Sequence, residues 1–579
     1  MATHRFSNRE VADMLSEIGQ MMELKGENKF KVIAYENAAN TIRSYPHDVA
    51  TIYDDAGIAG LDAIAGIGEK IAQKLTTLFS TGHLPYYEQL KELTPPLQLI
   101  LLGITGIGPQ TAKKLTETLQ PKNLSDLKRK LQTRTATAHF GQKTIENIVS
   151  ALKERRHEDR HLISEVEPIA NTLLEFLRNL PEVAAADPVG SLRRRKETVG
   201  DIDLVAASKD RKATVAALGK APFTRRVITA GTGQTTIVHE SGFQIDLELV
   251  PPAEYGSLLQ HFTGGKEHNV ALRTWADDQG WSLSEKGIKH IRTGKLKQYT
   301  TEEQFYKALK MDWIPPELRE NQGEIEAARE HTLPTLIEEK DIKGNLHIHT
   351  AASDGELPLD EMVKAAHAYG YKYIAITDHS HGAGGGLTDA ELAKHRDAIH
   401  KLDHRYEKKG MRILAGVEVN IRPDGTVDAD DAVLATLDFV IASVHSSFRQ
   451  SIDEMTKRVL KAIQNPNVDC IGHPSGRKLL HREEIELNWD EIYRAASKTK
   501  TLLEINASPD RLDLSDTRVR AAKEQGVRFV INTDAHRPEH FAFMRFGVGV
   551  ARRGWLTKKD VLNTQTASAM LRWLAGVEK

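Results

Sequence analysis

Three aspartates in the middle of the chain have the spacing of a paired-metal site. Asp201 and Asp203 lie two apart in D-I-D-L-V-A, and Asp246 lies in the later segment Q-I-D-L. Residues two apart in a strand project from one face. Converging carboxylates repel one another unless cations lie between them, and paired Mg²⁺ or Mn²⁺ ions can activate a hydroxyl and neutralise a leaving pyrophosphate. These aspartates are therefore predicted to be metal ligands and the catalytic residues of nucleotidyl transfer.

Groups suited to a triphosphate precede these aspartates, in the segment G-S-L-R-R-R-K-E-T-V-G. Gly190 and Ser191 could hold the terminal phosphates, and Arg194 would add a charge-assisted contact. A D-x-D pair alone would be explained as well by solvated aspartates in an exposed turn. The glycine–serine pair, the arginines and the third aspartate agree with one another, and together they favour a nucleotide site.

A second group of residues that could do chemistry lies between residues 341 and 540. Imidazoles and carboxylates follow or end successive short apolar segments there: His347, His349, Asp354, His379, Glu418, His445, His473, Asp534 and His536. Such ligands together suit Zn, Mn or Fe. Nine ligands are too many for one ion, so two or three ions are predicted. Clustered metals of this kind fit hydrolysis of phosphate esters.

Short apolar segments that alternate with helical patterns are expected to position these nine residues. Seven such segments follow residue 340, and their alternation predicts βα units around a parallel sheet, either open or closed into a barrel. Active sites of parallel βα folds form at the carboxyl ends of the strands, which is where the nine residues fall. Shorter strands are predicted between residues 183 and 250, and helices through the first 150 residues.

An internal repeat lies in the helical region. I-A-G-I-G-E-K-I-A-Q-K-L-T at 64–76 recurs as I-T-G-I-G-P-Q-T-A-K-K-L-T at 104–116. A glycine turn that opens a helix exposes backbone N–H groups, which bind anions. Two copies favour contact with a DNA backbone over simple glycine turns. The residues assigned to this contact are Gly66, Gly68, Lys70, Lys74, Gly106, Gly108 and Lys114.

Composition limits the class of protein. The 579 residues suggest about four domains, and 78 basic against 80 acidic side chains give a net charge of -2. Basic clusters are local, as in Arg193–Lys196, which predicts a protein that grips DNA at a few points. One cysteine, no signal-peptide pattern and no apolar run near 20 residues predict a cytoplasmic protein without a membrane segment.

The first 315 residues resemble the family X DNA polymerases, the group of DNA polymerase beta. The G-I-G turns resemble helix-hairpin-helix motifs, and the G-S to D-I-D spacing resembles that family's palm. The segment H-F-T-G-G-K-E-H-N-V-A-L-R resembles its nucleotide-binding segment, which implies nucleotide contacts from Phe262, Gly264 and Asn269 and places Arg273 near the template. Lys74 resembles that family's Schiff-base lysine, although its recurrence as Lys114 favours phosphate contact.

Some positions depart from the family pattern. His261 stands where well-known members have tyrosine, Gly265 where they have serine, and Gln244 where they have an arginine beside the third carboxylate. These departures bear on fidelity, sugar discrimination and rate. They leave the three predicted metal ligands in place.

The C-terminal part, about 336–575, resembles the PHP (polymerase and histidinol phosphatase) domain, a distorted seven-stranded βα barrel. The matching segments are H-I-H-T-A-A-S-D-G, T-D-H, S-V-H, G-H-P and T-D-A-H. The resemblance implies one metal on His347, His349, Glu418 and Asp534. It implies a second on Glu418, His445 and His473, and a third on Asp354, His379 and His536. Because all nine positions hold competent ligands, we expect an active site.

These resemblances predict a multidomain chain with all-α, α+β and α/β parts. The expected ranges are a helical 8-kDa-like domain with a helix-hairpin-helix at 1–82, fingers at 83–152, a nucleotidyltransferase palm at 153–255, a thumb at 256–316, a linker at 317–338 and a PHP phosphoesterase domain at 339–575.

The predicted function is template-directed filling of short gaps in base-excision repair. Gapped or nicked DNA and deoxynucleoside triphosphates would be the partners of a monomer. The PHP domain would supply 3′–5′ exonuclease or abasic-site endonuclease activity. One alternative is a nucleotidyltransferase for a small molecule with a histidinol-phosphatase-like domain. Another is a DNA-binding scaffold with inactive centres.

Overall fold

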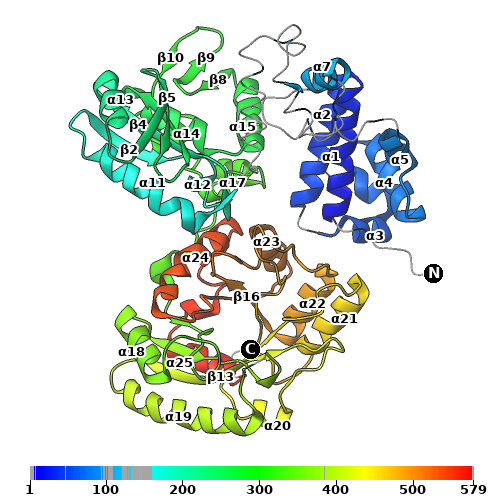
Figure 1. Cartoon of the computed structure of the whole chain (residues 1–579), viewed down its shortest axis with the longest axis vertical. Coiled ribbons are helices and arrows are strands. Elements are labelled where there is room, and N and C mark those ends of the chain that lie inside the picture. The colour runs from blue at the N-terminus through cyan, green and yellow to red at the C-terminus, as the bar shows by residue number, and fades with distance from the viewer. Residues whose placement is uncertain are drawn as a thin grey trace. The chain divides into compact units, whose positions relative to one another are not determined.

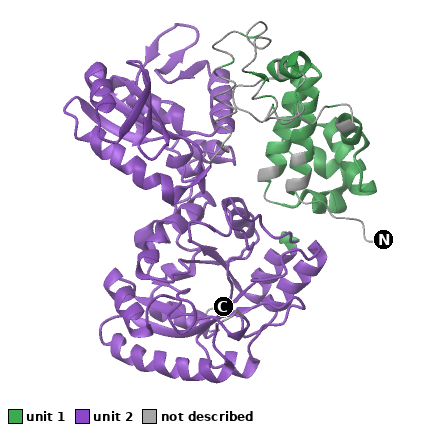
Figure 2. Cartoon of the chain, in the orientation of Figure 1, with its two compact units in different colours: residues 1–159, 488–490 green, residues 160–487, 491–579 purple. Residues whose placement is uncertain are grey.

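The chain divides into two units, residues 1–159 with 488–490 and residues 160–487 with 491–579 (Figure 2). The structure, a computed structural model, describes residues 6, 8–45, 47–64, 66–92, 94, 98, 101, 109–119, 121, 127, 130–131, 140, 145, 160–383 and 385–576. In this described part, no helix is both long and apolar enough to cross a bilayer.

Amphipathic helices build the first unit, as the three- and four-residue spacing of its apolar side chains predicts. They are α1 (Asn8–Leu24), α2 (Lys29–Ser44), α3 (Val49–Asp62), α4 (Glu69–Thr81), α5 (Pro85–Glu92) and α7 (Pro109–Leu119). Leu15, Ile18, Ile42 and Leu75 are fully buried in the core of this unit. Gly68 is the N-cap of α4, so the first glycine turn opens a helix as predicted.

A five-stranded sheet carries the aspartates in the second unit (Figure 1). Its spatial order is β2 (Val183–Pro188), β4 (Ile202–Ser208), β7 (Gln244–Val250), β6 (Gln234–His239) and β5 (Thr224–Ala230). The neighbouring helices are α11 (Ile163–Arg178), α12 (Gly190–Arg193) and α13 (Arg211–Gly219), and β1 (His161–Leu162) pairs with β3 (Thr198–Val199). Strands β4 and β7 are parallel, and their register places Asp203 directly opposite Asp246.

Helices and a small antiparallel sheet follow the five-stranded sheet. The elements are η1 (Pro252–Glu254), α14 (Tyr255–Thr263), α15 (Lys266–Asp278), β8 (Trp281–Ser284), β9 (Gly287–His290), β10 (Leu296–Lys297), α16 (Glu302–Ala308), η2 (Pro316–Leu318) and α17 (Glu324–Arg329). Phe305, Tyr306 and Leu318 are buried in the core of this region. The segment 317–338 was expected to be a linker. Its first residues belong to η2, and Leu318 packs into this core.

Seven parallel strands form the C-terminal part, in chain order across the sheet. They are β11 (Gly344–Asn345), β12 (Tyr373–Ile376), β13 (Arg412–Asn420), β14 (Phe439–Ser443), β15 (Cys470–Ile471), β16 (Leu502–Asn506) and β17 (Phe529–Asn532). A parallel bridge between Ile348 and Ala535 joins the first and last strand segments. The predicted parallel βα sheet is confirmed. Of the two predicted forms, an open sheet and a closed barrel, this bridge shows a nearly closed barrel.

Helices connect and surround these strands, as the alternating pattern predicts. They are η3 (Glu339–Asp341), α18 (Leu359–Tyr369), η4 (His381–Ala383), α19 (Asp389–Glu407), α20 (Asp431–Leu434), α21 (Ile452–Ile463), α22 (Trp489–Thr499), α23 (Asp516–Glu524), η5 (Pro538–Phe543), α24 (Met544–Arg553), η6 (Leu562–Thr564) and α25 (Ala567–Leu574). Strand side chains such as Tyr373, Phe439 and Val530 are fully buried, and Cys470 is a buried free thiol.

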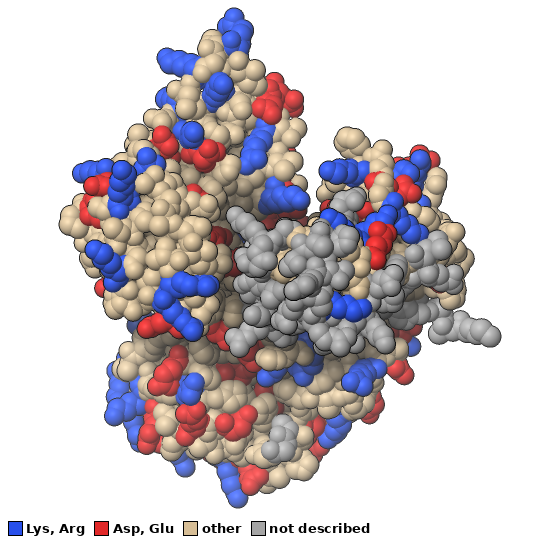
Figure 3. All heavy atoms as spheres, turned by 45° about the horizontal axis from the view of Figure 1, so that its top comes forward, with Lys and Arg blue, Asp and Glu red and all other residues tan. Residues whose placement is uncertain are grey.

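Charged groups are distributed without a dominant sign on the molecular face drawn in Figure 3, where basic and acidic side chains are interspersed among the described residues. This distribution agrees with the net charge of -2. On this face, the described residues form no single broad basic surface of the kind that would bind DNA along its length.

Candidate functional site

The three aspartates lie at one end of the neighbouring strands β4 and β7. Asp203 lies in β4 opposite Asp246 in β7, and Asp201 immediately precedes β4. Burial raises the pKa of Asp203 to about 6, and the charges of Asp201, Asp246 and Glu248 add to the effect. A carboxylate group under such repulsion fits a site for divalent cations, whose charge would stabilise the ionised form.

Hydrogen bonds fix the orientation of Asp246. Thr236 Oγ1 donates to Asp246 Oδ1 over 2.6 Å, and Gln244 Nε2 donates to Asp246 Oδ2 over 2.9 Å. Gln244, the departure from the family pattern, is therefore a neutral partner that holds the third carboxylate.

The loop before β4 packs directly against Asp203. Gly190 has a φ of 59°, and a Cβ atom at this position would lie 2.7 Å from Asp203 Oδ2. The backbone N–H of Val189 donates to the carbonyl of Asp203 over 2.9 Å. Glycine is thus required at 190 both for its backbone conformation and for the close approach of the carboxylate. Ser191 follows in the short helix α12.

The arginines of this loop have protein partners. Arg194 Nε donates to Glu320 Oε1 and its Nη1 to the carbonyl of Thr263, both over 2.8 Å. Arg193 forms a bidentate pair with Glu302 at 3.0 and 2.8 Å. The structure therefore places the guanidinium of Arg194, the predicted phosphate contact, in a largely buried ion pair.

The predicted nucleotide-binding residues gather where α14 ends and α15 begins. Asn269 Nδ2 donates to the carbonyls of His261 and Gly264 over 2.9 and 3.1 Å. Arg273 Nη2 lies 3.4 Å from His261 Nδ1. Phe262 is partly buried against the apolar cluster that includes Val189. The segment is therefore an ordered turn adjoining the aspartate loop.

The two repeat lysines have matching surroundings in the first unit. Lys74 Nζ lies 5.0 Å from the centroid of the Tyr86 ring, and Lys114 Nζ lies 4.9 Å from that of Phe140. Burial and the neighbouring charge of Lys70 lower the pKa of Lys74. The match supports a shared role for the two lysines. Gly106 and Gly108 lie outside the described residues.

The nine predicted ligands of the barrel converge around one buried carboxylate, Glu418. Its Oε2 lies 3.2 Å from His347 Nε2, 3.5 Å from His349 Nε2 and 3.2 Å from His379 Nδ1. Its Oε1 lies 3.2 Å from His445 Nε2 and 3.0 Å from His473 Nε2. Burial opposes ionisation of Glu418, yet His347, His379 and His445 hold its pKa well below the usual range.

The remaining ligands complete candidate metal groups around this centre. Asp534 Oδ1 lies 3.2 Å from His349 Nε2, and Asp354 Oδ2 lies 3.2 Å from His536 Nε2. Groups of potential ligand atoms within 4.8 Å of one another are His349–Asp354–His379–His536, His347–His349–Asp534 and His379–Glu418–His445.

Unpartnered polar atoms show that this cluster fits metal ions. Buried atoms without a hydrogen-bond partner in the described part of the protein include His347 Nε2, both ring nitrogens of His349, His379 Nδ1, Glu418 Oε1 and His473 Nδ1. Buried polar atoms normally have hydrogen-bond partners. A group of nitrogen and oxygen atoms without such partners is therefore expected where they bind cations instead. Divalent ions held here would supply Lewis-acid chemistry and activate water for phosphoester hydrolysis.

Comparison with known proteins identifies several parts of this architecture. Family models match at 6–84 (helix-hairpin-helix domain), 99–154 (SAM-like helix-hairpin-helix tandem), 258–320 (DNA polymerase beta thumb) and 345–508 (PHP domain). The DNA polymerase/3′-5′ exonuclease PolX of Bacillus subtilis is 36% identical over 568 residues, which cover 96% of this chain and 97% of the relative. The chain belongs to family X of the DNA polymerases.

Two further relatives match parts of this family X polymerase. A probable phosphatase of Thermoanaerobacter sp. is 31% identical over 229 residues, 38% of the chain and 89% of the relative. DNA polymerase lambda of Rattus norvegicus is 24% identical over 343 residues, 54% of the chain and 56% of the relative.

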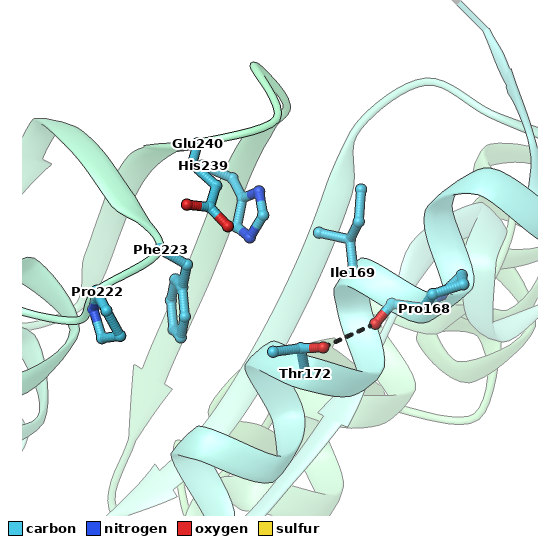
Figure 4. A pocket seen from close by; sticks show the side chains of 7 residues that line it. All are labelled: Pro168, Ile169, Thr172, Pro222, Phe223, His239 and Glu240. Carbon is cyan, nitrogen blue, oxygen red and sulfur yellow. Dashed lines mark hydrogen bonds between the residues drawn. The ribbon is translucent and has the colours of Figure 1, made fainter.

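The palm of this family X polymerase also has a surface pocket, between α11 and residues that flank β5 and β6 (Figure 4). It is lined by Pro168, Ile169, Thr172, Pro222, Phe223, His239 and Glu240. The predicted nucleotide and metal residues are absent from this lining. The pocket is therefore separate from the aspartate site.

Glu504 is a functional candidate that the sequence did not single out. It is fully buried in β16, and its Oε1 lies 2.7 Å from His347 Nδ1. Its Oε2 accepts the backbone N–H of His473 over 2.7 Å. A proton held on Nδ1 leaves Nε2 of His347 free to face Glu418. The available signal was a glutamate placed between apolar residues in the strand L-L-E-I-N.

We expect Glu504→Gln to weaken Mn²⁺ binding in the PHP domain by ~10–100-fold, because partners that orient a metal-ligating histidine have effects of this size. The amide keeps the shape of the side chain but removes its charge. Calorimetric titration of metal-free protein with Mn²⁺ measures the change, and excess Mn²⁺ should restore nuclease activity. Glu524→Gln, at an exposed pair with Arg520, is the control. Unchanged Mn²⁺ affinity in Glu504→Gln would show that the glutamate is merely structural.

Proposed function

We propose that this polymerase fills short gaps in DNA by template-directed nucleotide addition during base-excision repair. The observation that carries the proposal is the in-register pair of Asp203 and Asp246 beside the left-handed Gly190. Asp201, Asp203 and Asp246 would hold two Mg²⁺ or Mn²⁺ ions, which supply Lewis-acid chemistry when bound. The Bacillus subtilis relative, 97% of whose length is matched, is named as a DNA polymerase.

The substrate-binding roles follow from the neighbourhood of the aspartates. Gly190 and Ser191 would present backbone N–H groups and a hydroxyl to the triphosphate. Phe262, Gly264 and Asn269 would line the incoming nucleotide, with Arg273 near the template. Arg194 would reach a phosphate only by leaving Glu320, so its role requires an exchange of partners.

DNA would be held by the helix-hairpin-helix turns of the first unit. Gly66 has a φ of 96°, Gly68 is the N-cap of α4, and both glycines are exposed, so the start of α4 lies open to a phosphate next to Lys70 and Lys74. Such turns contact phosphates without reading bases, which suits an enzyme that acts at gaps of any sequence.

We further propose that the PHP domain is a 3′–5′ exonuclease. Its nine clustered ligands would hold two or three Mn²⁺ or Zn²⁺ ions, and the Bacillus subtilis relative carries this activity in its name. The residues of this chain would hold the scissile phosphodiester beside Glu418. The same centre could also support cleavage at abasic sites. The two activities differ in the DNA substrate that is cut.

Primer extension on a one-nucleotide gap tests both proposals in one gel. Extension by one nucleotide is expected with Mg²⁺ or Mn²⁺, and shortening of the primer from its 3′ end is expected without nucleotides. A chain that binds gapped duplex but does neither would be a scaffold. A chain that does not bind it would favour the small-molecule nucleotidyltransferase.

A further inference from the structure

Glu320 holds Arg194, the arginine proposed to contact the triphosphate, and two further cations lie against the same carboxylate oxygen. Arg194 Nε donates to Glu320 Oε1 over 2.8 Å. Arg553 Nη1 donates to that oxygen over 3.1 Å, and Lys196 Nζ lies 3.4 Å from it. Burial raises the pKa of Glu320, but the charges of the three cations outweigh burial and lower the pKa to about 2. Glu320 is therefore ionised at neutral pH and is shared by three cations.

Arg553 is the last residue of α24, a helix that contacts the barrel strands β16 and β17. Its side chain is 1% exposed. Its Nη2 donates to Asp516 at the start of α23, and its Nη1 also donates to the backbone carbonyl of Arg194 over 3.0 Å. Asp516 thus holds Arg553 independently of Glu320. The barrel therefore supplies a fixed cation to the loop that precedes the palm aspartates.

The backbone of this loop, residues 190–196, is fixed on both sides of Arg194. Arg195 Nη1 donates to the carbonyl of Arg545 in α24 over 3.2 Å. The backbone N–H of Lys196 donates to the carbonyl of Ser191 over 3.0 Å, which closes the loop on its own start. Because the backbone is held, an exchange of partners by Arg194 requires only a change in its side-chain rotamer.

Glycine at 265 provides the room that Glu320 occupies. A Cβ atom at Gly265 would lie 3.0 Å from Glu320 Oε2 and 3.2 Å from the carbonyl oxygen of Arg319. The serine found here in well-known family members would therefore crowd the carboxylate. The departure from the family pattern at 265 and the acidic side chain at 320 fit each other, which links Glu320 to the turn that is proposed to bind the nucleotide.

An arriving triphosphate changes the charges around Glu320. The single N–H of Arg194 Nε cannot be donated to Glu320 and to a phosphate at once. Once Arg194 has turned to the phosphate, a carboxylate left without a cation in this largely buried place would be destabilised and would repel the nucleotide. Arg553 and Lys196 stay against the same oxygen, so Glu320 keeps counter-charges during the exchange.

We propose that Glu320 and Arg553 together set the nucleotide affinity of the palm. Glu320 holds Arg194 while the site is empty, and Arg553 neutralises Glu320 when Arg194 moves to the triphosphate. Both are positioning residues, since they act through Arg194. The proposal rests on the proposed polymerase function and makes a residue of the barrel a determinant of nucleotide binding. Loss of the Glu320 charge should strengthen binding, whereas loss of the Arg553 fork should weaken it.

Single-turnover incorporation of thymidine triphosphate at a one-nucleotide gap tests this proposal, because it separates the nucleotide Kd from the rate of chemistry. Glu320→Gln should lower Kd ~10-fold at an unchanged maximal rate, since a charge-assisted hydrogen bond no longer competes for Arg194. Arg553→Lys keeps the charge but loses the fork that joins Glu320 to Asp516, so it should raise Kd ~3–10-fold. Glu317→Gln is the matched control. Glu317 lies in the same segment and pairs with Arg552 of α24 over 2.7 Å, and its replacement should leave Kd unchanged.

The variant Arg194→Met tests the exchange itself. In that background, Glu320→Gln should leave Kd unchanged, because the arginine that it would release is gone. An equal decrease of Kd in both backgrounds would overturn the proposal, since Glu320 would then act on the triphosphate by its charge alone. A parent-like Kd in Glu320→Gln, or in a folded Arg553→Lys, would overturn it as well.

Should Arg553→Lys not fold, the comparison of Glu320→Gln with and without Arg194→Met decides. Nucleotide binding is also measured without chemistry, by titrating thymidine triphosphate and Mg²⁺ into full-length protein on a gapped duplex whose primer ends in a dideoxynucleotide. If the parent bound the nucleotide but did not extend an ordinary primer, the polymerase function would be wrong. Opposite changes of affinity in Glu320→Gln and Arg553→Lys would still support the exchange in that case.

Discussion

Asp203→Asn is expected to reduce nucleotide incorporation at a one-nucleotide gap by at least ~10³-fold, about 4 kcal/mol of transition-state stabilisation. Asp203 is the central carboxylate of the palm, opposite Asp246 on the neighbouring strand and in contact range of Gly190. Asparagine keeps its shape but removes a charge that the proposed cations need. Shortening of the same primer by the PHP domain should continue at the parent rate.

The stability of this variant separates a catalytic effect from unfolding. Burial and neighbouring carboxylates raise the folded-state pKa of Asp203 to about 6. In metal-free protein, the ionised group therefore reduces the free energy of unfolding as pH rises from about 4 to 6, and the full reduction is present at pH 7.5. Asparagine removes this penalty, so the variant in EDTA should melt at or above the parent temperature.

A matched control for Asp203→Asn lies just beyond the other end of β4. Asp210 Oδ1 accepts the backbone N–H of Ala213 over 3.0 Å as the N-cap of α13. Asparagine caps helices as well as aspartate does, so Asp210→Asn should retain both synthesis and stability. Incorporation by Asp203→Asn within tenfold of the parent would show that the metal assignment in the palm is wrong.

Much of this molecule can be predicted from its sequence because the candidate functional residues lie in strands or directly after them. Asp203 and Asp246 each lie in a short apolar segment, and the nine PHP residues follow or end successive ones. A two-residue side-chain period and the geometry of parallel strands are enough to bring such residues together. The parallel sheet was thus predictable, whereas its closure depends on a bridge between Ile348 and Ala535, far apart in the chain.

Residues that act through tertiary neighbours were not predictable in this way. Glu504 lies inside an apolar strand, and its role becomes visible only when His347, 157 residues away, lies against it. Arg194 follows the family pattern for phosphate contact, yet its ion pair with Glu320 depends on packing across 126 residues. Local spacing gives the direction of a side chain. Whether that side chain contacts a ligand or another part of the protein depends on tertiary packing, which local spacing does not give.

The two halves of the second unit also meet through charges that composition does not reveal. Glu197, four residues before Asp201, pairs with Arg477, and Glu317 pairs with Arg552 at 2.7 Å. These acidic and basic groups neutralise one another inside the protein. The near-neutral total of the chain therefore includes many charges that are unavailable to DNA.

Glu418→Gln is expected to have the opposite effect to Asp203→Asn, with 3′–5′ degradation reduced ~10³-fold and synthesis retained. Five histidines lie within 3.5 Å of the Glu418 carboxylate oxygens, so this group would bridge the proposed ions. Glutamine is neutral, so it lacks the negative charge with which the carboxylate would stabilise neighbouring cations. Elemental analysis after dialysis should therefore show the loss of at least one Mn²⁺ or Zn²⁺ ion per chain.

Synthesis by the same preparation is the internal control for this variant. Glu418 is fully buried, and glutamine replaces one of its acceptor oxygens with an NH₂ group and removes the charge that the surrounding imidazoles face, which lowers the stability of the barrel. His349→Ala is therefore tested in parallel, because it removes a ligand of two candidate groups and leaves Glu418 in place. Both variants should extend a gapped primer without degrading it. Loss of synthesis in both, with melting unchanged, would contradict two independent catalytic centres, because a metal ligand of the barrel would then be required for chemistry in the palm.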